Sequence, residues 1–181
     1  MAKALIVTSL TFAALLLCGG QSAAQTTPEA FDQLKKLEGE WTGTLRLTPG
    51  EHLERLGLSA EQSLTLNYSV RSGGTSLLEE SSADGIEMVT VYNAQGNSLL
   101  STHYCVLANR PVGTLDASVN GVLSFTTDAD RSGLEKGRDE YVSSWRINLE
   151  PGNPNQFTYA YTVTKPDGSQ WSARSVVSRA N

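Results

Sequence analysis

The stretch YVSSWRINLEPGNPNQFTYAYTVTKPDGSQWSARSVV, residues 141–177, decides the fold class. Mostly apolar side chains occupy every second position in three segments, and this period of two predicts β-strands with one buried face. The alternating positions are Tyr141, Ser143, Trp145, Ile147 and Leu149, then Phe157, Tyr159, Tyr161 and Val163, then Trp171, Ala173, Ser175 and Val177. Turns rich in Pro, Gly and Asn separate the segments, which indicates antiparallel strands with short connections.

The same alternation continues toward the N-terminus. Further strands are expected at Trp41–Thr48, Ser63–Val70, Thr75–Ser81, Glu87–Tyr92, Ser98–Val106, Val112–Ala117 and Val122–Thr127. The pair Asn120 and Gly121 is the strongest hairpin signal among them. Antiparallel strands in this number form a sandwich or a closed barrel, and a barrel leaves no exposed edges. We therefore predict an all-β fold with one antiparallel barrel of about eight to ten strands.

Two segments do not fit the alternation. Phe31, Leu34 and Leu37 recur at helical spacing after Pro28, which predicts one short N-terminal helix over Pro28–Leu37 with Thr27 as its cap. The stretch Glu51–Gln62 mixes leucines with charges, and it is either a solvated insertion or a short helical lid at the mouth of a barrel.

The first residues predict export. Lys3 precedes an apolar run from Ala4 to Cys18, and small and polar residues follow as far as Ala24, which is the pattern of a signal peptide. We predict a signal peptide over residues 1–24 and one mature domain over residues 25–181, periplasmic or secreted and without a membrane span. A lipoprotein anchored through Cys18 is the alternative, but Leu17 stands where a lipidation site needs a small residue.

Composition excludes one broad class of partner. The chain has 181 residues and a formal net charge of −5, and its basic residues are scattered singly. Such a surface repels a phosphate backbone, so nucleic acid is not an expected partner. The sequence predicts no cofactor and leaves the oligomeric state open.

Two short motifs indicate a family. Gly39, Glu40 and Trp41 come between the helix and an alternating strand, and this order resembles the Gly-x-Trp opening of lipocalins and the wider calycin barrels. A second set of residues resembles an exported bacterial family of unknown function with a lipocalin-like barrel: Gly73–Thr75, Glu87–Tyr92, Thr102–Cys105, Asn109 and Pro111. The likeness implies that Trp41 plugs the closed end of a barrel under a basic residue, either Arg174 or Arg179. The chain departs from the pattern at Asn93 and Arg110, where His and Gln are expected.

The inner face of the barrel is the candidate binding surface. We assume a hairpin centred on residues 94–96, which places Met88, Thr90 and Tyr92 beside Leu100, Thr102 and Tyr104 inside the barrel. Aromatic rings with polar tips suit a small apolar or aromatic ligand, unless the same rings fill the barrel completely. The candidate ligand-binding residues are Met88, Tyr92, Thr102, Tyr104, Trp145, Tyr159 and Tyr161.

The reactive residues give weaker signals. With the assumed register, His103 and Cys105 face outward and His103 lies opposite Glu87. They lie side by side on one strand, so they form no catalytic dyad, and with too few further ligands they form no metal site. Glu79 and Glu80 point to opposite faces of their strand, so they form no acid/base pair, and each is expected to be a solvated or rim charge. A haem-binding barrel that uses His103, which requires this residue to face inward, and an enzyme of unknown reaction stay open as alternatives to a binding protein.

Overall fold

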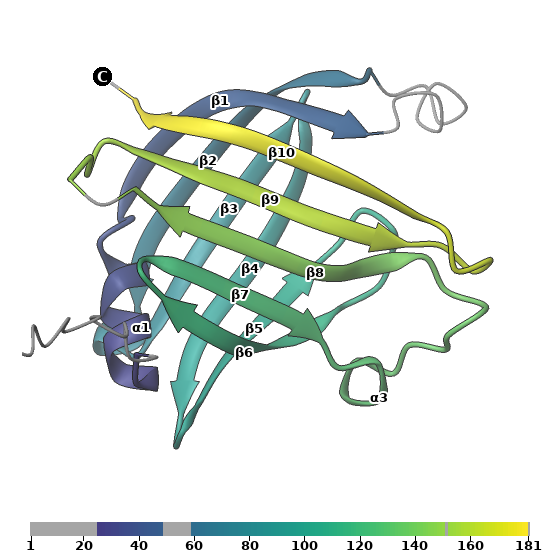
Figure 1. Ribbon diagram of the computed structural model, residues 1–181, viewed down its shortest axis with the longest axis horizontal. Helices are drawn as coiled ribbons and strands as arrows, with labels where there is room; N and C mark the ends of the chain where they lie inside the picture. Colours follow the sequence, from purple (N-terminus) through teal and green to yellow (C-terminus); the bar gives the residue numbers. More distant parts are fainter. Residues whose placement is uncertain (1–24, 49–58, 151, 181) are drawn as a thin grey trace, which may run out of the picture.

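The computed structural model describes residues 25–48, 59–150 and 152–180. In this part of the chain ten strands form a closed antiparallel barrel, in which each strand pairs with the next along the chain and β10 pairs with β1 (Figure 1). The strands are β1 (Gly39–Thr48), β2 (Glu61–Arg71), β3 (Ser76–Ala83), β4 (Ile86–Gln95), β5 (Ser98–Tyr104), β6 (Val112–Val119), β7 (Val122–Thr127), β8 (Tyr141–Leu149), β9 (Gln156–Thr164) and β10 (Gln170–Arg179). The predicted all-β barrel is confirmed.

The described residues also form three short helical segments: α1 (Thr27–Lys35), the 3-10 turn η1 (Ser72–Gly74) and α3 (Ala129–Ser132). The helix expected over Pro28–Leu37 is present but ends two residues earlier. Its cap is Thr26 and not Thr27, and the Thr26 backbone N–H donates a hydrogen bond of 2.8 Å to the Glu29 carboxylate. Helix α3 has no counterpart among the elements expected from the sequence.

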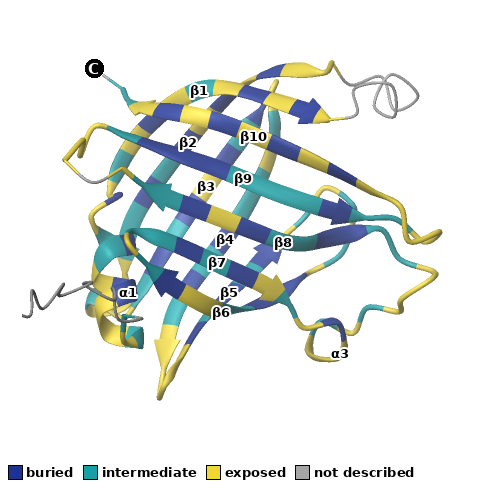
Figure 2. Cartoon of the chain, in the orientation of Figure 1, coloured by how far each residue is buried: buried dark blue, intermediate teal, exposed yellow. Residues whose placement is uncertain are grey.

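Alternating burial explains why the sheet closes on itself. In β10 the inward side chains are buried and their neighbours are exposed, and Figure 2 shows similar alternating bands on other strands. Two-residue turns hold adjacent strands in register. Asn120 and Gly121 both have positive φ, 53° and 82°, between the paired residues Val119 and Val122, so the predicted hairpin is confirmed.

One end of the barrel is closed beside α1 by the ring of Trp41. This side chain is 1% exposed, and its Nε1 donates a hydrogen bond of 2.7 Å to the backbone oxygen of Leu37. The guanidinium carbon of Arg179 lies 4.3 Å from the centroid of the Trp41 ring, and the Phe157 ring packs on it edge to face with the two centroids 4.8 Å apart. The resemblance implies this arrangement, and the basic residue is Arg179, because Arg174 is exposed on the outer face.

The hairpin of β4 and β5 differs from the expected register, because the partner of His103 lies three residues farther along β4, at Thr90 instead of Glu87. Its loop is the two-residue turn Gly96–Asn97, closed by the pair Gln95 and Ser98, so Thr90 lies opposite His103. Because side chains alternate between faces, this change moves His103 inside and places Thr102 and Tyr104 outside. Tyr104 is 51% exposed. The prediction that Thr102 and Tyr104 line the interior is therefore wrong.

The predicted pairing of Glu87 with His103 is wrong for the same reason. In the structure Glu87 lies opposite Ser82 of β3. The odd-numbered residues of β5 point into the barrel, while Glu87 belongs to the outer face of β4. His103 consequently has no acidic cross-strand partner at that position.

Two predicted features fall outside the described residues. They are the signal peptide, predicted over residues 1–24, and residues 51–58, which make up most of the Glu51–Gln62 interruption. Glu61 and Gln62, the last residues of that interruption, begin β2. No helix in the described ranges is long and apolar enough to cross a membrane.

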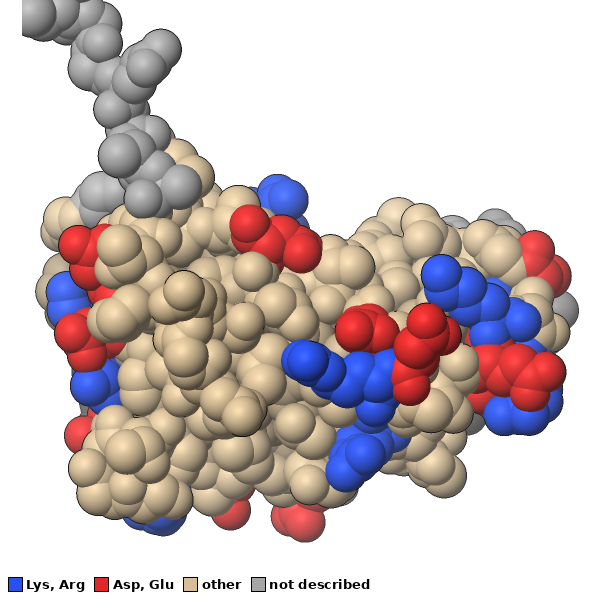
Figure 3. Space-filling model, turned by 90° about the horizontal axis from the view of Figure 1, so that it is seen from below, with Lys and Arg blue, Asp and Glu red and all other residues tan. Residues whose placement is uncertain are grey.

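Charge on the barrel surface is mixed in sign. Figure 3 shows one face on which basic and acidic side chains lie beside each other and much of the surface is uncharged. Arg138 forms ion pairs with Glu135 and, at 3.1 Å, with Asp139. Exposed pairs of this kind contribute little stability.

Candidate functional site

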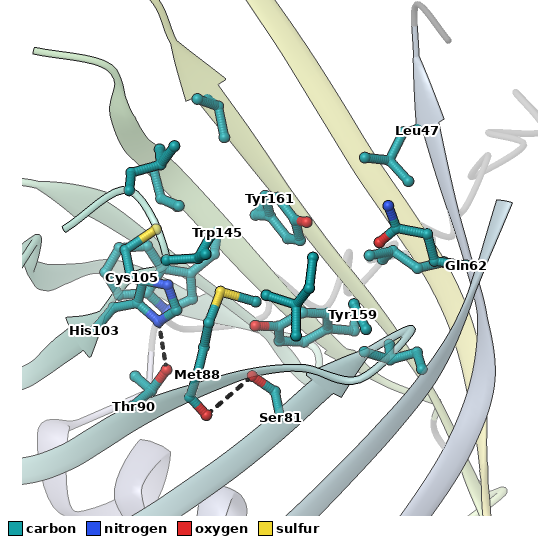
Figure 4. Close-up of a pocket in the computed structure, with 18 of the residues that line it drawn as sticks. Leu47, Gln62, Ser81, Met88, Thr90, His103, Cys105, Trp145, Tyr159 and Tyr161 are labelled. Carbon is teal, nitrogen blue, oxygen red and sulfur yellow. Dashed lines mark hydrogen bonds between the residues drawn. The ribbon is translucent and has the colours of Figure 1, made fainter. Parts of the chain in front are cut away.

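A cavity of about 90 Å³ lies inside the barrel, toward the end opposite α1. Apolar side chains form most of its wall: Leu45, Leu47, Leu64, Ala83, Ile86, Met88, Val142, Val163 and Trp171. Val106, Leu107 and Glu140 line it at the rim, and Val106 is also exposed to solvent. The polar groups Ser81, Thr90 and His103 contribute to the wall farther inside (Figure 4).

Five of the seven predicted ligand-binding residues line this cavity: Met88, Tyr92, Trp145, Tyr159 and Tyr161. The other two, Thr102 and Tyr104, lie on the outer face because of the hairpin register. His103 and Cys105 take their places in the wall. The sequence thus predicts the aromatic residues of the wall but assigns the inner and outer faces of β5 the wrong way round.

A row of polar side chains crosses four adjacent strands at the inner end of the cavity. Tyr68 on β2 lies opposite Glu79 on β3, Glu79 lies opposite Thr90 on β4, and Thr90 lies opposite His103 on β5. Side chains that are directly opposite on one face of a sheet are about 5 Å apart at Cβ. All four are buried, and Thr90 Oγ1 lies 2.9 Å from Nδ1 of His103. The register thus places a carboxyl, a hydroxyl and an imidazole group next to one another across β3, β4 and β5.

Glu79 is the acidic centre of this row. It is 0% exposed, so the prediction of a rim charge is wrong. The Tyr92 hydroxyl donates a hydrogen bond of 2.8 Å to Oε2, and the Tyr159 hydroxyl donates one of 3.1 Å to Oε1. Burial raises the pKa of Glu79, while the hydrogen bonds from Tyr92 and Tyr159 act in the opposite direction. No ion pair to Glu79 occurs among the described residues, and the tyrosine hydroxyls are the polar groups that contact its carboxyl oxygens.

The tyrosines around Glu79 are held in their neutral form. Burial, with the charge of Glu79 added to it, raises the pKa values of Tyr68, Tyr92 and Tyr159 well above the usual range. Tyr68 has a buried hydroxyl without a hydrogen-bond partner in the described part of the chain. An alternation signal for Glu79 did exist in the sequence, because Leu77, Glu79, Ser81 and Ala83 occupy one face of β3.

His103 is the imidazole at the cavity wall. It is 8% exposed, and burial lowers its pKa from 6.5 to about 4, so the ring is neutral near pH 7. Nδ1 contacts Thr90, and the described residues supply no hydrogen-bond partner for Nε2. Because His103 lines the cavity, it presents a neutral nitrogen base or donor to whatever occupies that space.

Trp145 is fixed by close packing on two sides. Its ring stacks on Phe125 with centroids 5.4 Å apart and planes inclined by 8°. A Cβ atom added to Gly113 would lie 2.1 Å from the ring, so only glycine leaves room for it. The buried Nε1 of Trp145 has no hydrogen-bond partner among the described residues. The rigid indole therefore sets the shape of one wall.

Cys105 follows His103 at the rim side of the cavity. It is half-buried, and burial raises the pKa of its thiol, which keeps the sulfur protonated. Within the described ranges, no three His, Cys, Asp or Glu side chains come together in a way that could hold a metal ion. A protonated thiol beside a neutral imidazole gives no nucleophile of the Cys/His type.

Comparisons with known proteins extend only to the fold. No protein-family model and no curated protein matches the chain. A solved structure of a DUF3598 family protein of unknown function from Nostoc punctiforme PCC 73102 is similar, with a TM-score of 0.56 and 14% sequence identity. The match covers 80% of this chain and 48% of that one, so the chain spans about half the length of that protein. Likeness at this identity is evidence for a similar fold alone, and chemistry cannot be transferred from it.

Proposed function

We propose that the protein is exported and binds a small, largely apolar molecule in the barrel cavity. The observation that carries the proposal is the cavity itself. An apolar wall with a few polar groups at its inner end is the usual composition of a small-molecule site. His103, Thr90 and Tyr92 supply those polar groups, and Leu47 and Met88 belong to the apolar wall.

The cavity volume limits the size of the ligand. In another protein an apolar cavity of about 150 Å³ binds benzene. The cavity of about 90 Å³ therefore suits a group no larger than a single ring, and the rest of a longer molecule would pass the rim near Val106.

Toluene titration tests the proposal directly. Two of the three tryptophans, Trp145 and Trp171, line the cavity, so occupation should change the intrinsic fluorescence. Native mass spectrometry of protein purified from its own host complements this titration, because it detects a retained ligand of any identity.

A matched pair of variants locates the binding. Ala83 faces the cavity and Ser82, its neighbour on β3, faces outward. Ala83→Leu fills the space and should weaken toluene binding by about tenfold or more, equivalent to about 1.4 kcal/mol. Ser82→Leu should leave the affinity unchanged. Absence of saturable binding, or equal effects of the two variants, would refute the cavity as the site.

Haem is a second candidate ligand because His103 faces inward. The volume argues against it, since drug-sized ligands already occupy pockets of about 300 Å³ or more. A haem bound through His103 would have to displace wall residues. Haem titration decides the matter: a Soret band that disappears in His103→Ala would place haem first, and its absence in the parent protein removes this candidate.

Export is proposed from the sequence of residues 1–24. Intact-mass measurement of periplasmic or secreted protein should give a chain that begins near Gln25. A diacylglyceryl adduct on Cys18 would instead show a lipoprotein.

A further inference from the structure

We propose that the ligand is an uncharged molecule with a hydroxyl group, and that this hydroxyl donates a hydrogen bond to Nε2 of His103. Glu79 and Thr90 act as positioning residues that keep Nε2 unprotonated. The inference rests on the proposed binding function, and it adds the chemical class of the ligand and the atom that recognises it.

Glu79 determines which groups donate and which accept in this row of hydrogen bonds. Both of its carboxylate oxygens accept hydrogen bonds from tyrosine hydroxyls, Tyr92 at 2.8 Å and Tyr159 at 3.1 Å. Glu79 thus accepts at both of its oxygens. Thr90 lies directly opposite Glu79 on the same inner face of the sheet, and we infer that its hydroxyl proton points toward this carboxyl group.

The Thr90 hydroxyl then determines which ring nitrogen of His103 carries the proton. A threonine hydroxyl has one proton, so a Thr90 that donates to Glu79 must accept from Nδ1 of His103, the nitrogen at 2.9 Å. Nδ1 then carries the ring proton. In a neutral imidazole only one nitrogen is protonated, so Nε2 keeps its lone pair. The cavity wall thus presents a hydrogen-bond acceptor that calls for a donor on the ligand.

The charges around the cavity select against ions. No Lys or Arg lines it among the described residues, so an anionic ligand would lack a counter-ion. Glu140, which lines the rim, adds repulsion against an anion. Moving an unpaired charge out of water is costly. A neutral hydroxyl, by contrast, pairs with Nε2 and leaves its carbon skeleton to the apolar wall.

Phenol, toluene and benzoate test this class because all three carry one ring. The quantity to measure is the ratio of toluene to phenol dissociation constants, in the parent protein and in His103→Phe. Loss of one neutral hydrogen bond should lower this selectivity by about fivefold. Tyr104→Phe is the control, because Tyr104 lies on the outer face and its loss of a hydroxyl should not change the ratio. Benzoate should show no saturable binding.

The outcomes separate this inference from the proposed function. If neither toluene nor phenol binds, cavity binding itself fails. If toluene binds and the ratio is the same in the parent protein and in His103→Phe, binding stands and the hydroxyl subsite is wrong. Benzoate that binds more tightly than phenol overturns the neutral class.

Nitrogen NMR tests the positioning role without any ligand. The chain has 2 histidines, so the His103 ring is assigned by its absence in His103→Phe. In the parent protein Nε2 should resonate as an unprotonated nitrogen and Nδ1 as a protonated one. Thr90→Val should mix the two tautomers and Thr90→Ser should restore the original one. A protonated Nε2 in the parent protein would overturn the inference even if His103→Phe does not fold.

Discussion

Burial of a neutral histidine makes the stability of the barrel depend on pH. The pKa of His103 falls from 6.5 to about 4 on folding, because the buried ring resists taking a charge. The difference, at about 1.4 kcal/mol per pH unit, amounts to about 3 kcal/mol of folding free energy. His103 is 8% exposed, so solvent screens little of this effect.

The sign follows from proton uptake. Between pH 4 and 6.5 the unfolded chain binds more protons at His103 than the folded chain, so the free energy of unfolding rises with pH in this window. About 2 kcal/mol of the effect should appear between pH 7 and pH 5, where most carboxylates stay ionised. Urea unfolding at several pH values, in parent protein and in His103→Phe, measures it as a difference of slopes.

Comparing the parent protein with His103→Phe cancels the contributions of the other titrating groups to the pH dependence of stability. Glu79 has a raised pKa, so its own contribution falls as pH rises, opposite to that of His103, but it is present in both proteins. The parent protein should lose about 2 kcal/mol more than His103→Phe on acidification from pH 7 to pH 5. If the free energy of unfolding changes with pH equally in both proteins, the pKa of His103 is not lowered by burial. His103 would then lie on the outer face and not in the cavity wall.

Three further substitutions test the packing. Trp41→Ala should lower the free energy of unfolding by about 3 to 5 kcal/mol in urea, and a loss below about 1 kcal/mol would mean that the ring is no plug. Gly113→Ala forces a methyl group against the Trp145 ring, so we expect a loss of about 1 to 3 kcal/mol with altered tryptophan fluorescence; an unchanged spectrum would contradict this contact. Tyr159→Phe removes a hydrogen bond from the buried Glu79 and should cost about 1 to 3 kcal/mol by urea unfolding, whereas a neutral effect would show that Glu79 finds another partner.

The strand pattern could be predicted because it rests on local sequence, and the plug was implied by the resemblance that Gly39, Glu40 and Trp41 carry. A period of two identifies a strand wherever one face is buried, and Trp41 belongs to a short motif at the start of one. The environment of Glu79 is different, because it depends on contacts between distant strands. Tyr159 lies 80 residues away along the chain, on the far side of the barrel, and its hydroxyl is one of the groups that make the buried carboxyl tolerable. Two adjacent glutamates suggest a solvated position when that partner is not known.

The face of His103 could not be predicted, and the composition of β5 explains why. Its odd positions carry Leu99, Ser101 and His103, and its even positions carry Leu100, Thr102 and Tyr104. Each face thus has one leucine, one small hydroxyl and one ring, so burial alone gives no preference between them. The length of the preceding turn carries the missing information. A two-residue turn with glycine first, as at Gly96 with φ of 59°, opposes even residues of β4 to odd residues of β5. A difference of one residue in loop length therefore determines which side chain of β5 lines the cavity. With the two-residue turn it is the imidazole of His103 and not the ring of Tyr104.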